Sequence, residues 1–160
     1  MRTKLLQTGL AVLTSVLLAT GAFTAARAQE GFRYVILKGG PVYQNAWTGT
    51  AGIDFVTRYH NSFELSFNYY RHKTGYGNYL LGLFYKPVLS RSKNAALKFR
   101  VGSHVGTDNS DFILSALGGL EFLQFLSGGL DLVFSGTGGY YFNGHNSWRI
   151  AGEIGLRFSF

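Results

Sequence analysis

Residues 47–60 read WTGTAGIDFVTRYH, and polarity alternates along this stretch with a period of two. The odd positions carry mostly apolar or small side chains, such as Ile53 and Phe55, and the even positions carry polar ones, such as Asp54 and Arg58. Successive side chains of a strand point to opposite faces of the sheet. The pattern therefore predicts a β-strand with one apolar face and one charged face.

The same two-residue period recurs along the rest of the chain. Further strands are expected within residues 32–39, 63–70, 78–88, 95–107, 112–123, 130–135 and 148–160. This makes eight strands, although the facing of the first is ambiguous. The connectors fall into two alternating sets, as in an up-and-down barrel. One set is short (60–62, 90–94 and 125–129) and the other is richer in Gly, Asn and Asp (39–46, 73–77, 107–110 and 136–146). We expect the second set to form the longer loops on the outside of the cell, and the first set to form the periplasmic turns.

The first 28 residues have the layout of a secretory signal peptide. Arg2 and Lys4 precede an apolar stretch at 10–22, and Ala26 and Ala28 supply the small residues of a cleavage site. The apolar stretch is shorter than the ~20 residues of a membrane-spanning helix. We therefore expect cleavage after Ala28 and one barrel domain at residues 29–160. Cleavage lowers the formal net charge from +7 to +4, so no nucleic-acid partner is argued from charge.

The charges indicate which face of the barrel points inward. Five acids and five bases lie on the polar face of the predicted strands: Asp54, Arg58, Glu64, Lys86, Lys98, Arg100, Glu121, Asp131, Glu153 and Arg157. An eight-stranded barrel leaves an interior that side chains just fill, and charges buried there must be paired. The apolar face is almost free of charge, whereas a Lys or Arg facing lipid at mid-depth costs ~2–4 kcal/mol. The alternative is a soluble barrel with an apolar core and a charged exterior.

These observations predict an all-β protein, an eight-stranded antiparallel up-and-down transmembrane β-barrel of the outer-membrane type. The last strand ends on Phe158 and Phe160, which share its apolar face. This ending resembles the terminal-aromatic signal that the barrel assembly machinery recognises. The resemblance implies that this machinery and outer-membrane lipid are partners of the protein.

No constellation of residues predicts catalysis, and no metal or cofactor is expected. The chain has no cysteine, and its four histidines show no paired metal-ligand spacing. His145 and Ser147 are similar to the His-x-Ser of eight-stranded lipid A deacylases. However, their parity points them into the lumen, and the surrounding motif of that family is missing. We therefore expect a non-enzymatic protein, with a lipid A-modifying enzyme as a remote alternative.

Several segments of the mature chain together resemble the TraO family of Bacteroidetes conjugative transposons. They are YLLGL at 79–83, YKPVL at 85–89, GGLEF at 118–122, GLDLV at 129–133 and the ending at 152–160. The resemblance implies a structural or assembly role in conjugative DNA transfer, as an outer-membrane component of a type IV secretion apparatus, alongside other conjugation proteins. The alternative is a general small outer-membrane barrel for adhesion or envelope protection.

Overall fold

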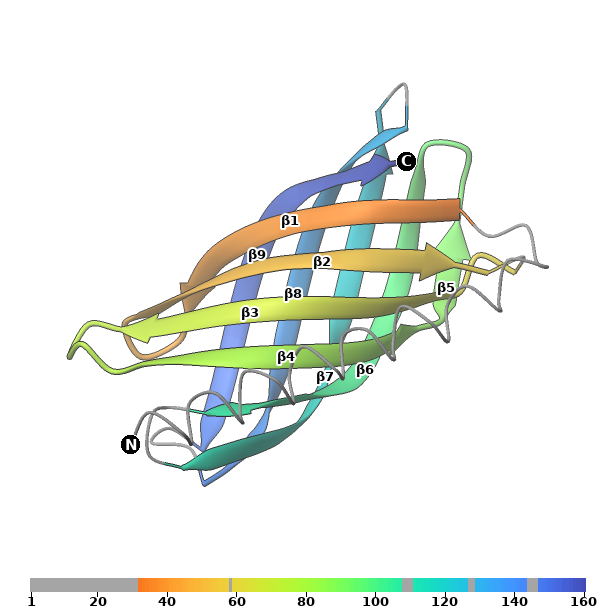
Figure 1. The fold of residues 1–160 in the computed structure, drawn as a ribbon. Helices are drawn as coiled ribbons and strands as arrows, with labels where there is room; N and C mark the ends of the chain where they lie inside the picture. The colour runs from red at the N-terminus through yellow and green to blue at the C-terminus, as the bar shows by residue number, and fades with distance from the viewer. Residues whose placement is uncertain (1–31, 58, 108–110, 127–128, 144–146) are drawn as a thin grey trace. The chain divides into compact units, whose positions relative to one another are not determined.

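The computed structural model describes residues 32–57, 59–107, 111–126, 129–143 and 147–160, so the predicted signal peptide lies outside the described residues. The barrel domain consists of strands and short connectors (Figure 1). The strands are β1 (Phe32–Val42), β2 (Ala46–Val56), β3 (Ser62–His72), β4 (Gly77–Lys86), β5 (Val88–Arg91), β6 (Ala95–Thr107), β7 (Phe112–Phe125), β8 (Leu130–Phe142) and β9 (Trp148–Ser159). The described part of the chain contains no helix long and apolar enough to span a membrane.

Consecutive strands pair antiparallel, except that β4 and β5 do not pair with each other, and the sheet closes on itself. The first and last strands, β1 and β9, are joined by a ladder from Tyr34–Ser159 to Val42–Ala151. Both β4 and β5 pair with β6, so together they fill one position in the wall and the barrel has eight strands. Figure 1 shows β1 to β4 forming one wall and β6 to β9 crossing behind it. The predicted eight-stranded antiparallel barrel is confirmed.

Pro87 explains why one of these eight strands is broken into β4 and β5. Proline has no backbone N–H and cannot donate to the ladder. The Pro87 carbonyl still accepts a hydrogen bond from the backbone N–H of Phe99 at 3.0 Å. The next N–H, that of Val88, donates instead to the Asn61 side chain at 3.0 Å. The register then shifts between Val88 and Ser90, as at a β-bulge.

The connectors are grouped at the two barrel ends as predicted. The strand ends that flank connectors 43–45, 73–76, 108–111 and 143–147 lie at one end of the barrel, and those that flank 57–61, 92–94 and 126–129 lie at the other with Phe32 and Phe160. The prediction of longer loops in the set rich in Gly, Asn and Asp is wrong. Residues 39–42 belong to β1, and residues 136–142 belong to β8. Glycines in these stretches permit close strand contact; a Cβ on Gly40 would collide with the carbonyl oxygen of Gly152.

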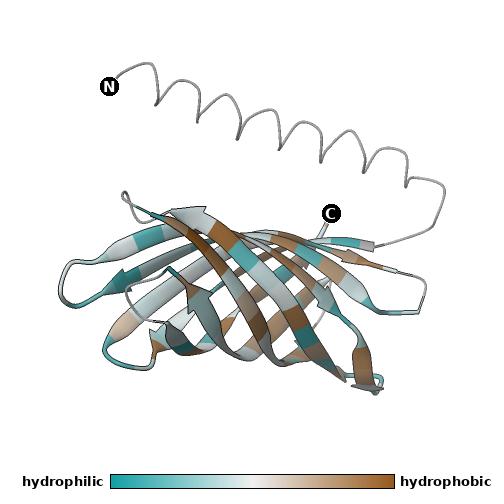
Figure 2. Cartoon of the chain, turned by 90° about the horizontal axis from the view of Figure 1, so that it is seen from below, coloured by the Kyte–Doolittle hydropathy of each residue, from teal (hydrophilic) through white to brown (hydrophobic). Residues whose placement is uncertain are grey.

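The outer wall is apolar and the interior is polar, which excludes the soluble alternative with a charged exterior. Outward side chains such as Leu83 and Ile154 are more than half exposed in the isolated chain. Hydrophobic and hydrophilic residues alternate along the strands in Figure 2. The strand of ambiguous facing, β1, turns Ile36 and Lys38 inward and Leu37 outward. The barrel therefore presents an apolar band to its surroundings, as a membrane-spanning barrel does.

Aromatic side chains gather on the outer wall near both barrel ends. Trp47 and Trp148 are exposed at the strand ends next to connectors 43–45 and 143–147. Tyr59 and Phe160 are exposed at the other end of the barrel. Aromatic residues form such girdles where a barrel wall meets the two membrane interfaces.

Candidate functional site

The interior of the barrel contains a dense layer of charged side chains. Nine of the ten predicted lumen residues are buried there: Asp54, Glu64, Lys86, Lys98, Arg100, Glu121, Asp131, Glu153 and Arg157. Arg58, the tenth, lies outside the described residues. Lys38 and Arg149 are also buried in the interior, although neither was among the predicted ten.

Glu64 on β3 is the centre of this layer. Its carboxylate lies 3.2 Å from the Nζ of Lys38 on β1, 2.9 Å from the Nζ of Lys86 on β4 and 2.8 Å from a guanidinium nitrogen of Arg100 on β6. The Glu64 side chain is fully buried. Charge-assisted hydrogen bonds of this length are about twice as strong as neutral ones. Glu64 therefore links four strands, β1, β3, β4 and β6, across the lumen.

Lys86 extends the layer to the other side of the barrel. Its Nζ lies 2.8 Å from the Glu121 carboxylate on β7 and 3.0 Å from the Asp54 carboxylate on β2, in addition to its contact with Glu64. One ammonium thus bridges three carboxylates from three strands. The charge on each group is compensated locally, as burial in a narrow lumen requires.

Arg157 on β9 completes the layer toward the barrel end that holds Phe32 and Phe160. Its guanidinium lies 2.6 Å from Asp131 and 2.9 Å from Asp54. It also stacks on Tyr34, with 4.0 Å between the guanidinium carbon and the ring centroid. We call the seven interlinked residues Lys38, Asp54, Glu64, Lys86, Arg100, Glu121 and Arg157 the charged plug.

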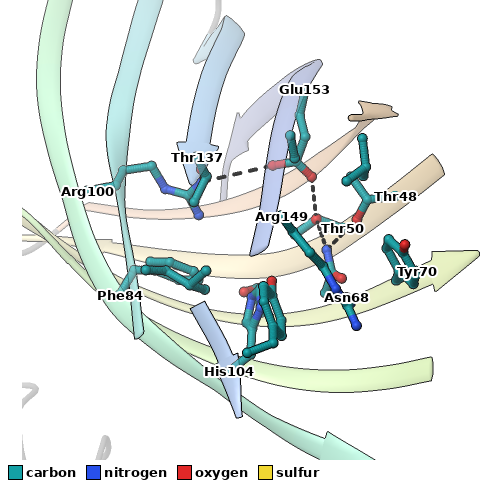
Figure 3. Close-up of a pocket in the computed structure, with 15 residues that line it drawn as sticks. Thr48, Thr50, Asn68, Tyr70, Phe84, Arg100, His104, Thr137, Arg149 and Glu153 are labelled. Atoms are coloured by element: carbon teal, nitrogen blue, oxygen red, sulfur yellow. Dashed lines mark hydrogen bonds and ion pairs between the residues drawn. The ribbon is translucent and has the colours of Figure 1, made fainter. Parts of the chain in front are cut away.

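Above the charged plug, toward connectors 43–45 and 143–147, the interior is lined by hydroxyls and rings (Figure 3). Glu153 accepts hydrogen bonds from Thr50 at 2.6 Å and Ser135 at 3.2 Å. Arg100 donates to the Thr137 hydroxyl at 2.9 Å and lies 4.2 Å from the centroid of the Phe84 ring. The arrangement leaves a cavity of about 30 Å³, which has room for about two water molecules.

His104 and Arg149 close this half of the lumen. The Nδ1 of His104 lies 3.1 Å from the Tyr141 hydroxyl, and its ring packs edge-on against Phe84. The Arg149 guanidinium lies between two rings, 3.9 Å from Tyr70 and 4.1 Å from Tyr141. These two cation–π contacts help to stabilise the buried guanidinium.

The sequence pattern could have predicted the inward facing of Arg149 but not that of Lys38. Arg149 shares the parity of Glu153, so the alternation of β9 already placed it on the polar face. Lys38 follows a stretch in which apolar residues occupy both faces, with Ile36 inward and Leu37 outward. No local pattern orients such a strand.

The structure does not test the other predicted features. His145 lies outside the described residues, and the Ser147 carbonyl accepts a hydrogen bond from the Tyr141 N–H at 2.7 Å. Phe158 and Phe160, the predicted assembly signal, are exposed on the wall and at the chain end. No group of three His, Cys, Asp or Glu side chains that could hold a metal ion occurs in the described part of the chain.

Comparison with known proteins agrees on the fold. No protein-family model matches the chain, and no curated protein matches its sequence. The structure is similar to the N-terminal β-barrel domain of Pseudomonas aeruginosa OprF, with a TM-score of 0.59 and 15% identity over 82% of this chain and 100% of that one. It is also similar to de novo designed transmembrane β-barrels. One has a TM-score of 0.58 and 15% identity, covering 81% of this chain and 96% of its own. The other, TMB2.3, has a TM-score of 0.55 and 16% identity, covering 81% and 94%. The chain therefore has the fold of a small transmembrane β-barrel.

Proposed function

We propose that the protein is a sealed outer-membrane barrel that serves as a non-enzymatic scaffold, acting through its connectors and outer wall. The charged plug supports this proposal. It crosses the full width of the lumen, and the cavity above it has a volume of only about 30 Å³. An ion or a polymer crossing the lumen would have to break several buried ion pairs, each of which is expensive to disrupt.

A planar-bilayer recording tests the sealed interior. We expect purified protein to insert without a large stable conductance, because the plug leaves no continuous water column. A matched variant, Arg100→Ala with Lys86→Ala, removes two central side chains and should raise the frequency of short openings. A stable nanosiemens channel from the unmodified protein would refute the sealed scaffold.

We further propose that this scaffold belongs to a conjugative DNA-transfer apparatus. The support is the resemblance of five segments, including 79–83 and 118–122, to the TraO family. A sealed barrel suits a structural or assembly part, because transferred DNA would need another route. Deleting the gene in a donor strain should lower the transfer frequency, and supplying it on a plasmid should restore transfer. Unchanged transfer would favour a general barrel for adhesion or envelope protection.

A further inference from the structure

A second cavity of about 250 Å³ lies at the barrel end that holds Phe32 and Phe160. Both polar and apolar side chains line this cavity, which we call the vestibule. The polar part is mostly cationic, with Lys98, Arg91 and Arg157, and the apolar part includes Leu123 and Phe125. A cavity with this lining suits a small molecule that carries one negative charge and a short apolar body.

Lys98 is the feature that points to a ligand. Its side chain is buried, with 3% exposed, and its Nζ donates a hydrogen bond to the Ser62 hydroxyl at 2.8 Å. No carboxylate of the described residues lies within 4.0 Å of this Nζ. The acid facing it across the strand register, Glu121, is instead bound to Lys86. Burying an ammonium without a counter-charge is costly, so an anion in the vestibule would stabilise it.

The charge balance of the interior agrees with this reading. Among the described residues the interior holds six buried cations and five buried carboxylates. Asp131, the acid that lines the vestibule, is already bound by Arg157 at 2.6 Å. The described interior as a whole therefore has one more cation than it has carboxylates, and the acid nearest to the vestibule is engaged by another cation.

The rim of the vestibule adds to the positive potential. Arg91 lies over the Phe125 ring, 5.3 Å from its centroid. Desolvation lowers the pKa of the His60 imidazole, and the charges of Arg91 and Lys98 lower it further. An anion that enters from this end thus meets a cationic rim before it reaches Lys98.

We propose that the vestibule binds a small carboxylate with a short apolar chain. The carboxylate would contact the Lys98 ammonium and the Ser62 hydroxyl, and the chain would pack against Leu123 and Phe125. The volume admits a chain of about six carbons. This site is independent of the sealed-scaffold proposal, since it lies on the open side of the charged plug and needs no passage through it.

The test is a titration of the full-length mature barrel in lipid nanodiscs with sodium hexanoate, followed by NMR of backbone amides. We expect saturable shifts at vestibule residues such as Val88 and Leu123, and none with the neutral analogue hexanamide. Lys98→Met should weaken hexanoate binding at least tenfold. Lys93→Met, which removes an exposed cation from connector 92–94 at the same end, should leave it unchanged.

The pKa of His60 provides a second readout. It should rise on hexanoate binding, because a negative charge enters the vestibule, and also in Lys98→Met, because a positive charge is removed. The mobility difference between unheated and heated samples on a gel shows that each variant is folded. Equal hexanoate affinity in Lys98→Met and Lys93→Met would overturn the proposal. So would the absence of saturable shifts, or binding of inorganic phosphate without binding of hexanoate.

Discussion

Replacing Glu64 by Gln should be among the most destabilising single substitutions in the barrel. The change keeps the shape of the side chain and removes one charge. Lys38 and Arg100 both lose their shortest carboxylate contact, at 3.2 and 2.8 Å. Their remaining carboxylate contacts lie between 3.7 and 3.9 Å, with Glu121 and Glu153.

The expected cost is about 3–5 kcal/mol, the range for removing one partner of a buried ion pair. Lys86 moderates the loss, because it keeps Asp54 at 3.0 Å and Glu121 at 2.8 Å. Lys38 and Arg100 have no such replacement at hydrogen-bond distance from a carboxylate. Arg100 keeps only its hydroxyl contact with Thr137 at 2.9 Å.

Glu153→Gln is the matched control. Glu153 is also buried, but its short contacts are hydroxyls, with Thr50 at 2.6 Å and Ser135 at 3.2 Å. Its nearest cation contacts, with Lys38 and Arg100, are at 3.9 Å. A glutamine oxygen still accepts from a hydroxyl, so the expected cost is about 1 kcal/mol.

Urea unfolding of the barrel in lipid vesicles measures both variants. The two tryptophans, Trp47 and Trp148, lie on the outer wall near one end and report the loss of the membrane-inserted state by fluorescence. The free energy of unfolding should fall by at least 2 kcal/mol more in Glu64→Gln than in Glu153→Gln. Equal decreases in the free energy of unfolding, or a more stable Glu64→Gln barrel, would show that the ion pairs of Glu64 do not stabilise the barrel.

Two further predictions concern the wall and its orientation. Gly82→Ala should destabilise the barrel by about 1–3 kcal/mol, because the added Cβ would lie 2.6 Å from the His104 ring. Gly49→Ala should be nearly neutral, because no atom lies within 4 Å of the added Cβ. Equal unfolding curves for the two variants would contradict this prediction. The chain has no cysteine, so Thr74→Cys should react with an impermeant maleimide on intact cells and Ser92→Cys only after permeabilisation. The reverse pattern would invert the predicted topology.

Much of the fold could be read from local alternation. A residue such as Asp54 or Glu121 between apolar neighbours is enough to assign the two faces of its strand, because side chains of a strand alternate whatever lies next to it. The eight strands and the grouping of their connectors at two ends followed from this period. Where small or apolar residues occupy both faces of a strand, polarity does not alternate, and the predicted strand bounds were incomplete or wrong. Glycines at 136–139 looked like a loop but form part of β8.

The pairing inside the lumen could not be read from the sequence. Parity placed Lys86, Asp54, Glu64 and Glu121 on inward faces, but not at the same height. Which side chains meet across a barrel depends on strand tilt and stagger, and these belong to the closed sheet as a whole. Sequence alone therefore determined that the interior is charged. Only the closed barrel decided that Lys86 joins three carboxylates while Lys98 faces an open vestibule.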